Sequence, residues 1–227
     1  MNKTAARIMK QHDFISRHRE DFDDFELEWF QRNIARMEDN FNYYPFVIRE
    51  IYDILKLVDD EKNLYHRFYE LVKELYDIRG KRILEVGAGV YPTLADRLCT
   101  EAGIVVCYDP RLTRSREDTP KLKLVRKDFK KNMSLADFDL VISLMPCKGA
   151  EAVCDACVEQ DKDFIVGLCE GGPHGDYHDY FEDEIEWRSS IMSYTDVRLR
   201  RNGTGKILTK ELDGCSYPYP IMYNSRK

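Results

Sequence analysis

Three acidic residues follow short apolar segments in the second half of the sequence, and two glycines lie just after the first of them. Glu85 precedes Gly87 and Gly89. Asp109 and Asp128 follow the next two apolar segments. Glycines at such a point let the backbone turn sharply and approach a ligand that a Cβ would exclude. Carboxylates at strand ends can hold a cationic amino group, ribose hydroxyls or an adenine amino group. The pattern therefore predicts a site for a ligand with a nucleoside end and an amino-acid end.

The glycine loop departs from two common phosphate-binding motifs. The third glycine of a dinucleotide fingerprint is replaced by Pro92, and the absence of a following Gly-Lys-Ser/Thr excludes a Walker loop. Glu85 would also repel a pyrophosphate, whereas it would attract a cationic amine. S-Adenosylmethionine satisfies all three acids, because its amine suits Glu85, its ribose suits Asp109 and its adenine suits Asp128.

With these residues, the segment 79–227 resembles a class I S-adenosylmethionine-dependent methyltransferase. The first motif of that family is an acid, any residue and then Gly-x-Gly-x-Gly, and Glu85 to Tyr91 match all but the last glycine. Tyr91 at that position would narrow the methionine pocket or stack on the ligand. The resemblance implies S-adenosylmethionine as cofactor and a Rossmann-like seven-stranded sheet with a reversed last strand pair. The cofactor-binding residues predicted in this way are Glu85, Gly87, Ala88, Gly89, Tyr91, Asp109, Asp128 and Ser143.

The loops after the fourth and fifth apolar segments should face the group that receives the methyl group. The fourth is followed by Ser143-Leu144-Met145-Pro146-Cys147, which differs from the Asp/Asn-Pro-Pro-aromatic motif of enzymes that methylate exocyclic or amide nitrogens. The fifth is followed by a polar loop in which His174 or His178 can act as a general base and Glu170 can orient either. Exposed histidines without a catalytic role are the alternative for this loop. The predicted acceptor is therefore a small molecule or an unidentified polar group.

Cys154 and Cys157 have the spacing of metal ligands. A structural zinc site normally needs a second close pair, which the sequence lacks. Residues 151–160 predict a helix between two strands, with both thiols turned toward the sheet. We therefore expect buried free cysteines and no bound metal.

Strand-length apolar segments alternate with helix-length segments from residue 79 onward. Such alternation predicts an α/β fold, a doubly wound and mostly parallel sheet with helices on both faces. The predicted strands are Arg82–Val86, Ile104–Tyr108, Leu122–Val125, Leu140–Leu144 and Phe164–Leu168. After them, Val197–Arg201 and Lys206–Lys210 flank Asn202-Gly203, a pair that favours a tight turn. We expect a C-terminal antiparallel hairpin at this point.

Residues 1–78 differ in composition from the rest of the chain. They contain no glycine and one proline, and apolar residues recur at helical spacing, as in Phe68, Val72 and Leu75. This composition predicts an N-terminal helical cap, and residues 79–227 would form the S-adenosylmethionine-binding domain. The cap would line the acceptor pocket with aromatic side chains. An ordinary helical core or a homodimer surface is the alternative.

Composition and charge narrow the class of protein. A formal charge of −6 argues against a general nucleic-acid binder, because phosphate affinity needs a clustered excess of Lys and Arg. No apolar run is long enough for a membrane span, and the N-terminus lacks the apolar segment of a secretory signal. The seven cysteines are scattered rather than framing loops. These features predict a cytoplasmic protein with mostly free thiols.

Two alternative functions keep the cofactor or the fold. A helical region before such a core also resembles enzymes of the nicotianamine-synthase type, which transfer the aminocarboxypropyl group of S-adenosylmethionine. The other alternative is a noncatalytic binding module that has retained the methyltransferase fold.

Overall fold

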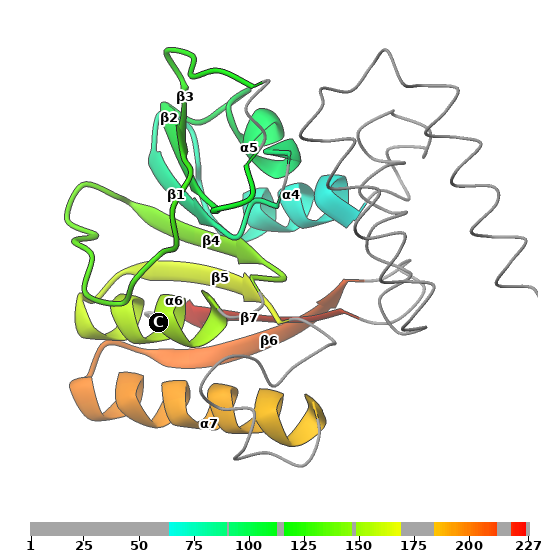
Figure 1. The fold of residues 1–227 in the computed structure, drawn as a ribbon. Helices are drawn as coiled ribbons and strands as arrows, with labels where there is room; N and C mark the ends of the chain where they lie inside the picture. Colours follow the sequence, from blue (N-terminus) through cyan, green and yellow to red (C-terminus); the bar gives the residue numbers. More distant parts are fainter. Residues whose placement is uncertain are drawn as a thin grey trace, which may run out of the picture. The chain divides into compact units, whose positions relative to one another are not determined.

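The computed structural model describes residues 64–89, 91–112, 116–146, 149–168, 184–212 and 219–225 (Figure 1). The chain divides into two compact units, and the architecture below is that of the unit formed by Asp60–Leu112 and Asp118–Lys227. Most of the predicted helical cap, residues 1–63, lies outside the described residues. The same is true of the three catalytic candidates, Glu170, His174 and His178.

A seven-stranded sheet forms the centre of this unit (Figure 1). Its strands are β1 Arg82–Val86, β2 Ile104–Tyr108, β3 Leu122–Val125, β4 Leu140–Leu144, β5 Asp163–Gly167, β6 Lys206–Leu212 and β7 Tyr219–Ser225. They lie in the order β3-β2-β1-β4-β5-β7-β6. The first five strands in this order are parallel, and β7 is antiparallel to both β5 and β6. The predicted Rossmann-like seven-stranded sheet with a reversed last strand pair is confirmed.

The central strands β1 and β4 are mostly apolar, as expected for strands with both faces covered. Every residue of β4 is buried, and β1 is buried from its second residue onward. β1 and β2 pair with Val86 opposite Tyr108, and Tyr108 lies opposite Val125 of β3. The loops that leave β1, β2 and β3 therefore start at one edge of the sheet. Ligands of open parallel sheets bind at this carboxyl edge.

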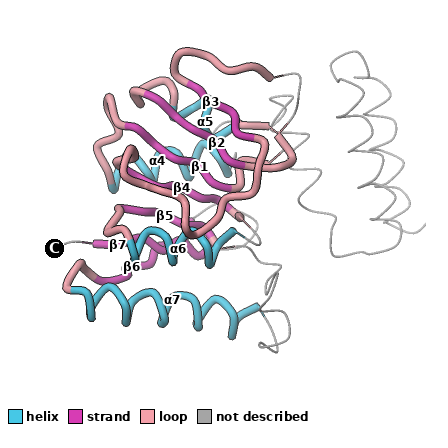
Figure 2. The backbone as a smooth tube through the Cα atoms, turned by 60° about the vertical axis from the view of Figure 1, so that its left-hand side comes forward, coloured by secondary structure: helices cyan, strands magenta, loops and turns pink. Residues whose placement is uncertain are grey.

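Helices cover both faces of the sheet (Figure 2). The helices are α4 Leu64–Leu75, α5 Thr93–Leu98, α6 Ala150–Glu159 and α7 Glu184–Asn202. α4 and α5 share one buried apolar cluster with the sheet, and α6 and α7 share a second cluster with it. No helix in the described part of the chain is long and apolar enough to cross a membrane.

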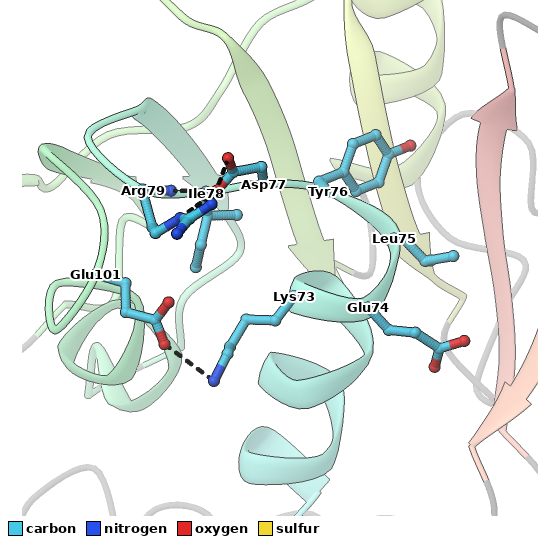
Figure 3. A pocket seen from close by; sticks show the side chains of 8 residues that line it. All are labelled: Lys73, Glu74, Leu75, Tyr76, Asp77, Ile78, Arg79 and Glu101. Carbon is cyan, nitrogen blue, oxygen red and sulfur yellow. Dashed lines mark hydrogen bonds and ion pairs between the residues drawn. The ribbon is translucent and has the colours of Figure 1, made fainter.

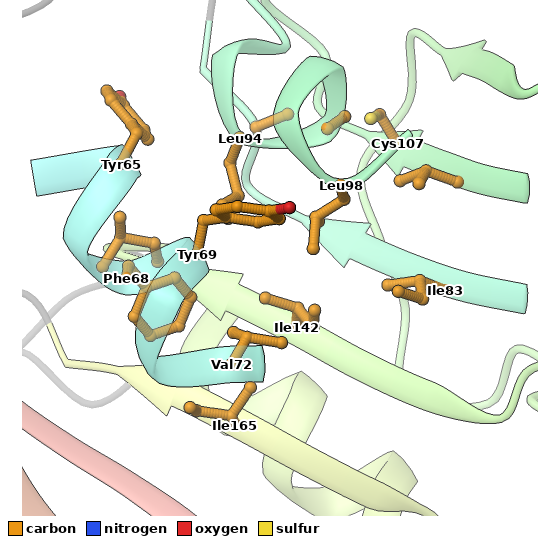
Figure 4. Close-up of a cluster of buried hydrophobic side chains, with 14 of the residues drawn as sticks. Tyr65, Phe68, Tyr69, Val72, Ile83, Leu94, Leu98, Cys107, Ile142 and Ile165 are labelled. Atoms are coloured by element: carbon orange, nitrogen blue, oxygen red, sulfur yellow. The ribbon is translucent and has the colours of Figure 1, made fainter. Parts of the chain in front are cut away.

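Helix α4 belongs to the same core as the sheet. Its apolar side chains lie on one face, and Phe68 and Val72 are completely buried. Figure 4 shows Val72 beside Ile142 of β4. Just after the helix, the hydroxyl of Tyr76 lies 3.0 Å from a backbone carbonyl oxygen of β5. The predicted domain boundary after residue 78 therefore falls inside the compact unit that holds the sheet.

The predicted strand Val197–Arg201 is wrong, because these residues form the last turns of α7. This helix buries every fourth residue, a helical spacing that the intervening charged residues obscured: Trp187, Ile191, Thr195 and Leu199. The predicted turn at Asn202-Gly203 instead ends the helix. The N–H of Gly203 donates to the carbonyl of Arg200, and the N–H of Thr204 donates to the carbonyl of Leu199. The C-terminal hairpin consists of β6 and β7.

Candidate functional site

The loop after β1 requires glycine at its turn. The backbone φ of Gly87 is +79° and that of Gly89 is +78°, in the left-handed region that glycine adopts without strain. A Cβ on Gly87 would lie 2.8 Å from the Cα atom of Pro146, which follows β4. The N–H of Gly87 also donates to the carbonyl oxygen of Tyr108 at 2.8 Å. The glycine loop is thus held between the ends of β2 and β4.

Asp109 follows β2 and is fixed against the glycine loop. Asp109 is 2% exposed, and its Oδ2 accepts a hydrogen bond from the N–H of Gly89 at 2.9 Å. Arg111 donates from its backbone N–H and its Nε to Oδ1, at 2.8 and 3.1 Å. The Nη2 of the same arginine donates to Oδ2 at 3.1 Å. The sequence pattern did not predict Arg111 as a partner of Asp109. The one indication in the sequence is its position, two residues after an acid at a strand end.

Glu85 is the second buried acid of the site. Glu85 is 2% exposed, and the Sγ of Cys107 donates a hydrogen bond to its Oε2 at 3.2 Å. Burial raises the pKa of Glu85 to about 7; the Cys107 hydrogen bond opposes this rise, and the negative charges of Asp109 and Asp96 add to it. The backbone N–H of Ala95, in the first turn of α5, is a further hydrogen-bond partner of the carboxyl group. A cation near this group would stabilise its ionised form.

The other predicted cofactor residues lie in different environments. Ser143 is completely buried, and its hydroxyl donates to the carbonyl oxygen of Val86 at 2.6 Å. It therefore ties β4 to the start of the glycine loop. Ala88 is buried within that loop, and Tyr91 is partly buried just after it. Asp128 is exposed in the loop that follows β3.

Two aromatic rings connect the loop after β3 to the end of β2. The rings of Phe129 and Tyr108 meet edge to face, with their centroids 6.2 Å apart. Phe129 follows Asp128 and Tyr108 precedes Asp109, so these two acids belong to neighbouring loops of the carboxyl edge. The structure brings Glu85, Asp109 and the glycine loop together and leaves Asp128 on the solvent side of the same edge.

The backbone at the end of β4 is strained. Met145 has a φ of +53°, which is uncommon for a residue with a Cβ and occurs preferentially at functional sites. Its N–H donates to the carbonyl oxygen of Gly167 at 2.8 Å. The next residue, Pro146, is the one that a side chain on Gly87 would strike. Nothing in the residue pattern predicted this conformation.

A separate cavity of about 360 Å³ lies at the opposite, amino edge of the sheet (Figure 3). Its lining comes from the end of α4, the segment before β1 and the segment before β2: Lys73, Glu74, Leu75, Tyr76, Asp77, Ile78, Arg79 and Glu101. The Nζ of Lys73 pairs with Glu101 at 2.9 Å, and the Nε of Arg79 pairs with Asp77 at 2.9 Å. This cavity contains none of the predicted cofactor residues.

Cys154 and Cys157 are buried in α6 against the sheet, as predicted. Burial raises the pKa of both thiols, so they stay protonated at neutral pH. Within the described ranges, no cluster of His, Cys, Asp and Glu side chains is arranged to hold a metal ion.

No protein-family model and no curated protein matches the sequence. Among solved structures, magnesium protoporphyrin IX methyltransferase from Synechocystis PCC 6803 with bound SAM is 14% identical over 73% of this chain and 80% of its own, with a TM-score of 0.47. The same enzyme with bound SAH is 12% identical over 79% and 99%, with a TM-score of 0.47. The 23S rRNA methyltransferase ErmE is 20% identical over 71% and 68%, with a TM-score of 0.44. Likeness at this level says nothing about the ligand or acceptor of this chain.

Proposed function

We propose that this chain is an S-adenosylmethionine-dependent methyltransferase that acts on a small molecule or another polar acceptor. One observation carries the proposal: the N–H of Gly89 in the glycine loop donates to the buried carboxylate of Asp109 at 2.9 Å. This hydrogen bond joins the glycine loop after β1 to the acid after β2. A ligand with a nucleoside end and an amino-acid end would need both. Both lie at the carboxyl edge, where open parallel sheets bind their ligands.

The residues of this edge fit the parts of S-adenosylmethionine. The buried carboxyl group of Glu85 has a pKa of about 7 and two acidic neighbours, so an ammonium group beside it would relieve both its burial and the repulsion. Asp109 offers carboxylate oxygens to the ribose hydroxyls. Asp128, exposed in the neighbouring loop, would accept a hydrogen bond from the adenine amino group.

Methyl transfer asks little of the protein beyond alignment. S-Adenosylmethionine supplies an electrophilic methyl group on a sulfonium, and its transfer to a nucleophile leaves S-adenosylhomocysteine. The strained turn at Met145 and Pro146 contacts the glycine loop, so it suits a role in placing the acceptor. A base is needed only where the acceptor must lose a proton, and Glu170, His174 and His178 remain the candidates.

The first test of this proposal is ligand binding. In isothermal titration calorimetry we expect the full-length protein to bind S-adenosylhomocysteine and not NAD, because the buried acid Glu85 suits an ammonium group rather than a pyrophosphate and Pro92 replaces the third fingerprint glycine. Binding of NAD without any response to S-adenosylhomocysteine would refute the proposal. Once an acceptor is found, product analysis identifies the reaction. Methyl transfer releases S-adenosylhomocysteine, aminocarboxypropyl transfer releases methylthioadenosine, and a noncatalytic module releases neither.

A further inference from the structure

The carboxylate of Asp109 has no acceptor position left for a ligand. An ionised carboxylate has about four lone-pair sites, two on each oxygen. Oδ1 accepts from the backbone N–H and the Nε of Arg111, and Oδ2 accepts from the N–H of Gly89 and the Nη2 of Arg111. A pair of ribose hydroxyls can therefore bind this carboxylate only after two of the four donors leave.

The four donors differ in how readily they can be displaced. Two are backbone N–H groups, and the one from Gly89 is held by a loop locked between β2 and β4. The other two belong to the guanidinium of Arg111, whose side chain is 47% exposed, while that of Asp109 is 3% exposed. The half-exposed side chain of Arg111 is therefore the donor that can turn toward solvent, while the carboxylate of Asp109 stays buried.

We propose that the guanidinium of Arg111 occupies the ribose-hydroxyl positions of the cofactor site and must leave Asp109 when the ribose binds. This inference rests on the proposed function. The two backbone donors would stay in place and keep the carboxylate oriented, so the arginine acts as an internal competitor. Only molecules in which Arg111 has left the carboxylate can bind the ribose. Arg111 therefore lowers the apparent affinity for ribose-containing ligands in proportion to the fraction of such molecules.

The chain contains a matched control for this arginine. Asp77 and Arg79 have the same spacing and the same bonds: N–H to Oδ1 at 3.3 Å, Nε to Oδ1 at 2.9 Å and Nη2 to Oδ2 at 3.1 Å. This second pair lies at the amino edge of the sheet and lines the separate cavity there. Arg79→Ala removes the same charge and the same set of arginine hydrogen bonds, here from an exposed pair, without touching the glycine loop.

The experiment compares the affinity of S-adenosylhomocysteine for wild type, Arg111→Ala, Arg111→Lys and Arg79→Ala, with folding checked by thermal unfolding. We expect Arg111→Ala to bind about fivefold more tightly than wild type, which corresponds to about 1 kcal/mol. Arg111→Lys keeps the positive charge but loses the bidentate contact with the carboxylate. Its affinity for S-adenosylhomocysteine should therefore lie between those of wild type and Arg111→Ala. If Arg111→Ala does not fold, the affinity of Arg111→Lys tests the inference instead. Arg79→Ala should bind as wild type does.

Salt provides a second readout. The difference in affinity between wild type and Arg111→Ala should narrow between about 0.05 and about 0.5 M salt, because salt screens the charge of the half-exposed guanidinium. Folded Arg111 variants that bind S-adenosylhomocysteine no more tightly than wild type would overturn the inference and leave the proposed function standing. If no variant binds the ligand at all, removal of the arginine opens no ribose site, and both proposals fail.

Discussion

At the scale of single residues, the site combines two acids with different surroundings. The carboxyl group of Asp109 accepts hydrogen bonds from Gly89 and Arg111. The carboxyl group of Glu85 is buried with a weak thiol donor, and burial raises its pKa to about 7. Burial also raises the pKa of Cys107, so its thiol is the donor of this pair. The two acids therefore favour different partners, hydroxyl donors for Asp109 and a cation for Glu85.

The raised pKa of Glu85 predicts a specific dependence of stability on pH. Below pH 4.5 this group is protonated in both the folded and the unfolded chain. As pH rises from 4.5 to 7, the unfolded chain ionises first, so the contribution of Glu85 to folding stability is progressively lost. Relative to Glu85→Gln, the unfolding free energy of wild type should therefore fall by up to about 3 kcal/mol over this range. Above pH 7 the difference should stay constant.

Urea unfolding of both proteins at several pH values measures this difference directly. A difference that stays flat from pH 4.5 to 8 would show that Glu85 titrates normally. Added S-adenosylhomocysteine should reduce the pH dependence of wild type, because its ammonium group would stabilise the ionised carboxylate.

At the scale of elements, the bounds of β1 to β4 could be predicted from the sequence because each strand is a short, mostly apolar segment between polar loops. The same reasoning failed for α7, where buried residues occur once in four positions among charged ones. Arg111 could not be predicted as a partner of Asp109, since the contact depends on the local path of the loop after β2. The positive φ of Met145 could not be predicted either, because methionine has no preference for this conformation.

The close contact between Gly87 and Pro146 predicts that alanine at position 87 lowers the unfolding free energy. Gly87→Ala adds a Cβ that would lie 2.8 Å from the Cα of Pro146, at a φ of +79°. Gly203→Ala adds a Cβ at a φ of +70°, with no atom within 4 Å. We expect the Gly203 variant to lose about 1–2 kcal/mol of unfolding free energy from backbone strain alone. The Gly87 variant should lose at least about 1 kcal/mol more, because backbone atoms must shift.

Urea unfolding of the two glycine variants gives the comparison. Equal losses would mean that the loop moves away from Pro146 without cost. We also expect S-adenosylhomocysteine binding to be lost in Gly87→Ala and retained in Gly203→Ala, since only the first glycine lies in the cofactor loop.

At the scale of the whole molecule, the predicted cofactor residues all lie after residue 80, but the unit that holds them begins earlier. α4 contributes completely buried side chains to the core of this unit. A fragment that starts at residue 79 would therefore lack part of its core, whereas one that starts at Asp60 keeps the whole unit together. We predict that removal of residues 1–59 leaves cofactor binding unchanged.

The most direct test of the account is the titration of S-adenosylhomocysteine into a fragment of residues 60–227, with and without Asp109→Ala. The folded fragment should bind with the affinity of the full chain. Asp109→Ala should weaken that binding roughly tenfold or more, because a hydrogen bond to a charged group contributes about 1.5–3 kcal/mol. A folded fragment that does not bind, or an Asp109 variant that binds as the fragment does, would contradict the assignment of the cofactor site to this edge of the sheet.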